Sequence, residues 1–191
     1  MRKIYSILAI SLFTISAFAL PPQTTEERQY VVDILNSIYS VEDLPERYNN
    51  YRTKYEQSFD APFEDVFNAV TNTLNEQDCR SAVSKQTQDD DGFFKGVIKS
   101  DYCVFAEGTD DLYDKLENYS LKIPKIRGGI WETGRVKYTF IIREQEDGSS
   151  NLLIKGEISG FERNITETIH FWESNGNFEA AFLDSVIQKL Q

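Results

Sequence analysis

Two cysteines lie at equal distances on either side of an acidic turn, and this spacing constrains the fold more than any other feature. Asp89-Asp90-Asp91-Gly92 separates two stretches of strand-like sequence and can form a three-residue hairpin loop that ends at Gly92. Asp89 then faces Phe93, and counting outward places Cys79 opposite Cys103. Directly opposed residues on antiparallel strands have Cβ atoms about 4.5–5.5 Å apart, close to the disulfide requirement. The sequence therefore predicts a β-hairpin closed by a Cys79–Cys103 disulfide.

The N-terminus has the pattern of a cleaved secretory signal. Arg2 and Lys3 precede an almost wholly apolar run, and Ala17-Phe18-Ala19 supplies the small residues that a signal peptidase reads. The apolar run is short for a transmembrane helix, which needs about 20 residues. We expect residues 1–19 to be a signal peptide, so that the mature protein is periplasmic or secreted with no integral membrane segment. An uncleaved anchor is the alternative.

The net charge of −11 bears on the class of partner. Nucleic acids and anionic lipid surfaces are both bound by proteins with clustered Lys and Arg residues. A chain with 31 acidic and 20 basic residues is not typical of either class. We therefore expect no nucleic-acid partner, and the simplest interpretation of the charge is that it keeps an exported domain soluble.

Two further segments are expected in the mature chain. Thr24 and Glu27 form a capping box ahead of apolar residues spaced three and four apart, which predicts a helix at about 25–40. A polar connector follows, so that residues 20–50 form an N-terminal helix and connector. Residues 51–191 are expected to form a single domain.

The domain itself alternates between strand-like and helical sequence. Apolar stripes predict helices at about 62–77 and 178–190, and a further short helix can form at 109–119. Strands are expected at 51–60, 79–88, 93–106, 135–146, 152–161 and 164–173. Tight turns between strands favour an antiparallel sheet. The predicted fold class is α+β: a sheet of about six antiparallel strands packed against two helices in a helix-grip-like arrangement, preceded by the N-terminal helix.

Part of the sequence resembles a known superfamily. Tyr55–Phe67, in which a strand leads through Ala61-Pro62 into a helix, resembles the opening of helix-grip domains of the START-like superfamily. Gly176–Leu190 is similar to their long C-terminal helix. Those domains typically have two short helices after the first strand, whereas one helix leads directly to Cys79 here; in this respect the chain is also similar to small helix-on-sheet domains of bacterial envelope lipoproteins. The resemblance implies a hydrophobic pocket between sheet and C-terminal helix, and binding rather than catalysis.

The sequence offers little catalytic or metal chemistry. The one histidine, His170, lies in a predicted strand without a recognisable nucleophile motif, since no Gly-x-Ser-x-Gly elbow is present. The acidic turn at 89–92 lacks the alternating ligands of an EF-hand loop. We therefore expect no enzymatic activity, no metal site and no cofactor.

Two functions remain open. The first is a non-catalytic binding module for a hydrophobic small molecule, and ordinary core packing is the alternative role for its candidate pocket residues. These candidates are Trp131, Tyr138, Phe140, Trp172 and Phe182. The second is an envelope protein that contacts another protein through its N-terminal helix or an exposed sheet edge, without a small ligand.

Overall fold

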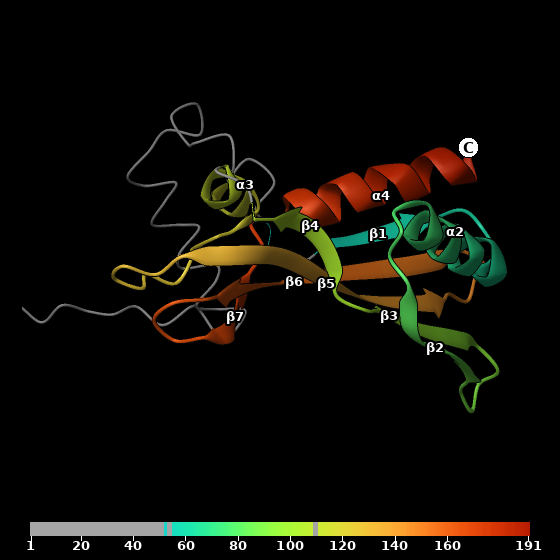
Figure 1. Ribbon diagram of the computed structural model, residues 1–191. Coiled ribbons are helices and arrows are strands. Elements are labelled where there is room, and N and C mark those ends of the chain that lie inside the picture. The colour runs from blue at the N-terminus through green and yellow to red at the C-terminus, as the bar shows by residue number, and fades with distance from the viewer. Residues whose placement is uncertain (1–51, 53–54, 109–110) are drawn as a thin grey trace, which may run out of the picture.

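The computed structural model of the protein describes residues 52, 55–108 and 111–191. The predicted signal peptide and the predicted helix and connector at 20–50 lie outside these residues. The described part has an α+β fold in which seven antiparallel strands form one sheet and three helices pack on it (Figure 1). The α+β class and the antiparallel sheet are thus confirmed.

The elements have the following bounds. The strands are β1 (Tyr55–Phe59), β2 (Ser81–Gln88), β3 (Phe94–Ser100), β4 (Cys103–Glu107), β5 (Trp131–Glu144), β6 (Ser150–Glu162) and β7 (Thr168–Glu173). The helices are α2 (Phe63–Glu76), α3 (Leu112–Tyr119) and α4 (Asn177–Leu190).

A long hairpin of β5 and β6 forms the centre of the sheet. The two strands pair from Glu144 and Ser150 at the turn to Trp131 and Glu162 at the far end. Each outer edge of this hairpin carries two shorter strands end to end: β3 and β4 pair with β5, and β1 and β7 pair with β6. Strand β2 completes the sheet beside β3. The sheet therefore has two ends, one near the β5–β6 turn and one near β4 and β7.

The sheet has one more strand than the six expected, because the predicted strand at 93–106 is interrupted. Strands β3 and β4 both pair with β5, but their registers differ by one residue. At the interruption the N–H of Asp101 donates to the carbonyl of Arg80 at 2.7 Å, and the N–H of Tyr138 in β5 donates to the side-chain hydroxyl of Ser100 at 2.8 Å. A local irregularity of this kind leaves hydrophobic alternation almost unchanged, so the pattern alone indicates one long strand.

The predicted disulfide is confirmed. Cys79 and Cys103 are bonded, with their Cα atoms 5.3 Å apart. The three-residue loop is also present, since the N–H of Asp89 donates to the carbonyl of Phe93 at 3.0 Å and Gly92 has a left-handed φ of 93°. The β2–β3 ladder keeps the expected register as far as Val83 and then shifts by a bulge. The expected facing of the two cysteines is therefore close, although a bulge separates them from the regular ladder.

All three helices lie on the same side of the sheet (Figure 1). Helix α2 buries the expected stripe, and Phe67 packs so closely on β3 that a Cβ at Gly96 would lie 2.8 Å from its ring. Helix α4 lies beside α2 and buries Phe182 and Val186 against the sheet. Helix α3 covers the end near β4, where Leu116 packs over Gly134. The main core and a smaller second cluster thus share one face of the sheet.

Candidate functional site

Three of the predicted pocket residues belong to the main core. Tyr138 and Phe140 point from β5 towards the helices, and the ring of Phe182 on α4 lies 5.2 Å and 4.6 Å from their ring centroids. All three side chains are almost completely buried. The structure therefore brings these three residues together, and their rings are in contact with one another.

The other two predicted pocket residues lie in the smaller cluster. The rings of Trp131 and Trp172 are 5.3 Å apart in an edge-to-face arrangement. The indole N–H of Trp172 donates to the hydroxyl of Ser120 at 2.6 Å, which connects β7 to the end of α3. The five candidates thus form two groups, one beneath α4 and one near α3.

A buried glutamate lies between α4 and the sheet. The Glu179 carboxylate accepts the N–H of Gly156 at 2.9 Å and the hydroxyl of Ser174 at 2.7 Å. Burial raises the pKa of Glu179, and these two hydrogen bonds oppose the rise. Burial, followed by the proximity of Glu179, also raises the pKa of the Tyr138 hydroxyl. Burial thus favours the uncharged form of both groups within the aromatic interior.

His170 has a local partner. Its Nε2 lies 2.7 Å from the hydroxyl of Thr166, and its ring packs against the edge of Trp131. In the part of the chain that the structure describes, no three His, Cys, Asp or Glu side chains are grouped so that they could hold a metal ion. No described helix is long and apolar enough to cross a membrane.

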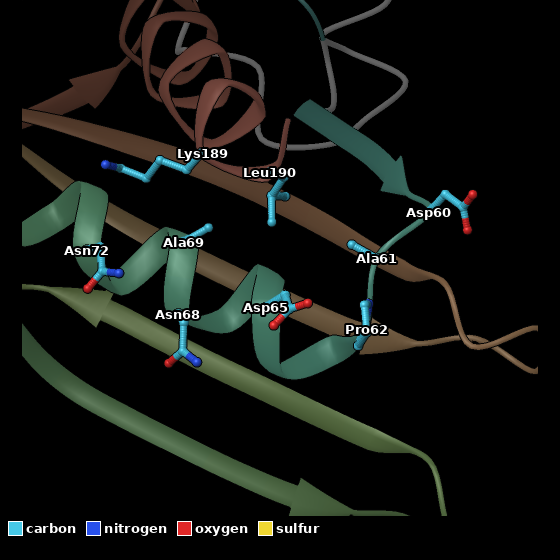
Figure 2. Close-up of a pocket in the computed structure, with 9 residues that line it drawn as sticks. All are labelled: Asp60, Ala61, Pro62, Asp65, Asn68, Ala69, Asn72, Lys189 and Leu190. Atoms are coloured by element: carbon cyan, nitrogen blue, oxygen red, sulfur yellow. The ribbon is translucent and has the colours of Figure 1, made fainter.

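A polar groove lies between the start of α2 and the end of α4 (Figure 2). Its volume is about 570 Å³. The lining residues are Asp60, Ala61, Pro62, Asp65, Asn68, Ala69, Asn72, Lys189 and Leu190. The carboxylates and amides among them are exposed, and the half-buried Lys189 side chain is paired with Glu76 at 2.6 Å. The groove therefore lacks a buried polar group that would fix the orientation of a small ligand, and it contains none of the predicted pocket residues.

The face of the sheet opposite the helices carries a different set of side chains. Paired residues on neighbouring strands share a face, so the pairings place alternate residues of each strand on this uncovered side, which we call the open face. Seven cations stand at such positions: Lys85, Lys95, Lys99, Arg135, Lys137, Arg143 and Lys155. The carboxylates at such positions are Glu56, Glu107, Glu157 and Glu173. The open face is therefore basic in a protein whose net charge is −11.

The helices have the opposite balance of charge. Their sequences contain seven carboxylates and two lysines, Lys115 and Lys189. Both lysines form salt bridges within the helical layer, with Asp111 and Glu76. Within the described ranges, none of the seven open-face cations forms a salt bridge. The helical side of the sheet is thus acidic and its lysines form salt bridges, whereas the open face is basic and its cations form none within the described ranges.

One end of the open face is apolar. Four large side chains are exposed there, and we call them the apolar patch: Tyr102 (36%), Val104 (49%), Ile169 (46%) and Phe171 (51%). The ring centroids of Tyr102 and Phe171 are 6.3 Å apart, although β4, which begins directly after Tyr102, and β7 lie on opposite sides of the central hairpin. The Nζ of Lys137 lies 4.7 Å from the centroid of the Tyr102 ring. Exposed apolar side chains that lie together often form a binding surface.

Arg135 lies beside the apolar patch. It pairs with Val104 on one side and with Ser159 on the other, and Ser159 in turn pairs with Phe171. Its Nε is buried and has no hydrogen-bond partner. A buried donor without a partner costs free energy, so an acceptor supplied by a bound molecule would be stabilising at this position.

A buried carboxylate fixes the loop between β6 and β7, next to the apolar patch. Glu162 accepts hydrogen bonds from the backbone N–H groups of Ile130, Asn164, Ile165 and Thr166. Burial by itself would raise the pKa of Glu162, but these hydrogen bonds outweigh it and hold the pKa well below its usual range. The loop that leads into β7 is therefore held by a charged group at neutral pH.

Comparisons with protein-family models, with curated proteins and with solved structures found no match to this chain.

The open face was not among the sequence-based candidates, although a signal for it exists. Lys95 and Lys99 in β3, and Arg135, Lys137 and Arg143 in β5, are separated by even numbers of residues. Even spacing within a strand places side chains on one face. The signal becomes interpretable only when the pairing of the two strands is known, because each strand alone shows a common mixture of charged and apolar residues.

Proposed function

We propose that this protein is an exported, non-catalytic binding protein whose partner is a polypeptide with acidic side chains around an apolar face. The observation that supports this proposal best is the open face, where unpaired cations adjoin the exposed apolar patch. An apolar centre beside charged groups is the usual composition of a protein interface. The Cys79–Cys103 disulfide supports export, because disulfides persist in oxidising compartments such as the periplasm.

The acidic helices do not cancel the attraction of an acidic partner to the open face. Packed layers of secondary structure lie about 10 Å apart. The Debye length at physiological ionic strength is about 8 Å, so the solvent-exposed charges of the helices, which lie farther from a partner on the open face, act on it more weakly than the charges that contact it. Lys137 and Arg135 would therefore act on a bound chain more strongly than the net charge suggests.

A hydrophobic small molecule between the sheet and α4, which the START-like resemblance implies, is a second proposal. The buried carboxyl of Glu179 and the buried hydroxyl of Tyr138 support it, since both could orient a ligand among aromatic rings. Such a ligand would have to separate Phe182 from the rings of Tyr138 and Phe140. Binding to the open face requires no rearrangement of the described residues, so the geometry favours the first proposal.

Binding of a designed peptide tests the first proposal. The probe is a fluorescently labelled amphipathic helical peptide with Leu and Tyr on one face and Glu on the other, and fluorescence anisotropy measures its affinity. We expect the double variant Arg135→Glu/Lys137→Glu to bind it at least about tenfold more weakly than the unaltered protein. The affinity of the unaltered protein should also fall with rising salt.

Two matched controls interpret this result. The variant Lys115→Glu/Lys189→Glu changes the net charge by the same amount on the helical side, and it should bind the probe with nearly unchanged affinity. A probe in which every Glu is replaced by Lys should not bind measurably. Equal weakening by the two double variants would mean that net charge alone governs binding, and the open-face proposal would be wrong.

A further inference from the structure

The chain enters the sheet on the same edge as β7. Strand β1 begins with Tyr55 beside Ile154 of β6, and β7 ends with Glu173 beside Glu157 of β6. Both strands therefore lie along one edge of β6, and the β6 residues that pair with their nearest ends are three positions apart. At about 3.4 Å per residue this separation is about 10 Å. The N-terminal end of β1 thus points along β6 towards β7, which carries Ile169 and Phe171 of the apolar patch.

The preceding segment is long enough to reach the patch. Phe171 pairs with Ser159, five residues along β6 from Ile154, which corresponds to about 17 Å. About 15 residues separate position 40 from β1, and a fully extended chain covers about 3.3–3.6 Å per residue. The predicted helix at 25–40 can therefore lie on the patch without strain in the connector.

The composition of that segment complements the open face. Six apolar residues of the predicted helix are spaced for one face: Tyr30, Val31, Ile34, Leu35, Ile38 and Tyr39. Residues 24–50 contain six carboxylates and two arginines, so their net charge is negative. The apolar patch and its neighbours Arg135 and Lys137 offer an apolar surface beside positive charge. Attachment to the same chain gives the segment a high effective concentration at this surface.

We infer that residues 24–40 pack as an amphipathic helix on the apolar patch and compete there with the external partner. The competition rests on the proposed function, whereas the packing of residues 24–40 on the patch can be measured separately. The segment belongs to the class of polypeptide that the open face is proposed to bind, namely acidic side chains around an apolar stripe. An external partner would have to displace this segment, so the segment lowers the apparent affinity of the open face for the partner.

Thiol labelling of the full mature chain tests the packing. The native cysteines are bonded to each other, so the variant Ile169→Cys adds one free thiol within the patch. Adding Ile34→Asp/Leu35→Asp, which places two charges on the apolar stripe, should increase the labelling rate of this thiol at least about tenfold. The matched pair Asn36→Asp/Ser37→Asp adds the same charge to the polar side of the predicted helix and should leave the rate unchanged.

A second thiol position and the peptide probe separate the outcomes. The variant Thr139→Cys places a thiol on the open face away from the patch, and its labelling rate should not respond to either pair of substitutions. If the Ile169→Cys thiol labels equally fast with and without Ile34→Asp/Leu35→Asp, the packing inference is overturned, while probe binding still decides the proposed function. If the packing is present, Ile34→Asp/Leu35→Asp should also strengthen probe binding; unchanged probe affinity would overturn the competition.

Discussion

The two faces of the sheet are made by the same strands but have opposite properties. On the side covered by helices, Phe140 and Ile98 are fully buried and pair with each other. Their strand neighbours on the other side, including Thr139 and Lys99, are accessible to solvent and belong to a basic surface. The covered face stabilises the fold, whereas the open face has charge and apolar groups that the described part of the chain leaves unmatched. The net charge of the chain describes neither side of the sheet, because the open face is basic and the helices are acidic.

The largest contrast between the faces should appear when aromatic side chains are truncated. Phe182→Ala removes a fully buried ring that contacts Tyr138 and Phe140, and it should lower the free energy of unfolding by about 3–5 kcal/mol. Phe171→Ala, in the apolar patch, should change it by no more than about 0.5 kcal/mol. Urea denaturation measures both values. Similar losses for the two variants would show that the open face also contributes to the core.

The disulfide belongs to the covered face, since Cys79 is buried in the main core. Cys79→Ala/Cys103→Ala removes the cross-link between residues 24 apart in sequence. The chain-entropy model predicts a loss of about 3–4 kcal/mol in the free energy of unfolding. Urea denaturation under non-reducing conditions measures the loss, with Val104→Ala as a neighbouring open-face control. A double variant as stable as the unaltered protein would contradict this role.

Adjacent residues of β3 provide a third comparison. Gly96→Ala would place a Cβ 2.8 Å from Phe67, so we expect overpacking to lower the free energy of unfolding by about 1–3 kcal/mol. Val97→Ala, one residue away on the open face, should cost less. Thermal denaturation of both variants gives the order, and a larger loss for Val97→Ala would reverse the assignment of the two faces.

The smallest effect concerns the pH dependence of stability. Burial raises the pKa of Glu179 above its ordinary value of 4.5, so the folded protein holds a proton at pH values where the unfolded chain has released it. Stability should therefore fall as pH increases from 4.5 through the raised pKa, and Glu179→Gln should remove this fall. Urea denaturation across this pH range measures it, with the exposed Asp184→Asn on α4 as the control. A fall that persists in Glu179→Gln would assign it to another group.

Local features were predictable from the sequence, while the features that depend on strand pairing were not. The hairpin loop at Gly92, the disulfide and the stripe of α2 follow from short-range spacing, and the structure confirms them. The interruption at Asp101 depends on a register shift against β5, a strand more than 30 residues away. Hydrophobic alternation cannot show such a shift, so the pattern predicts one strand too few.

The candidate site shows the same limit. Aromatic residues such as Tyr138 and Phe182 are pocket candidates in the sequence, yet in the structure their rings pack on one another. Lys99, Arg135 and Lys155 lie far apart in the chain, and only the order of the strands places them on one surface. Because the chain has more acidic than basic residues, its net charge gives no indication of this basic surface.

Chemical-shift mapping by NMR tests the central claim, that the open face is the binding surface, most directly. The isotope-labelled mature protein is titrated with the acidic amphipathic peptide, and the backbone amide shifts of all strands and helices are followed. The account predicts that the largest changes cluster on β4, β7 and the adjoining part of β5, around Phe171 and Lys137, and that Arg135→Glu/Lys137→Glu abolishes them. Changes centred on α4 and Phe182, or on the groove beside Leu190, would contradict it.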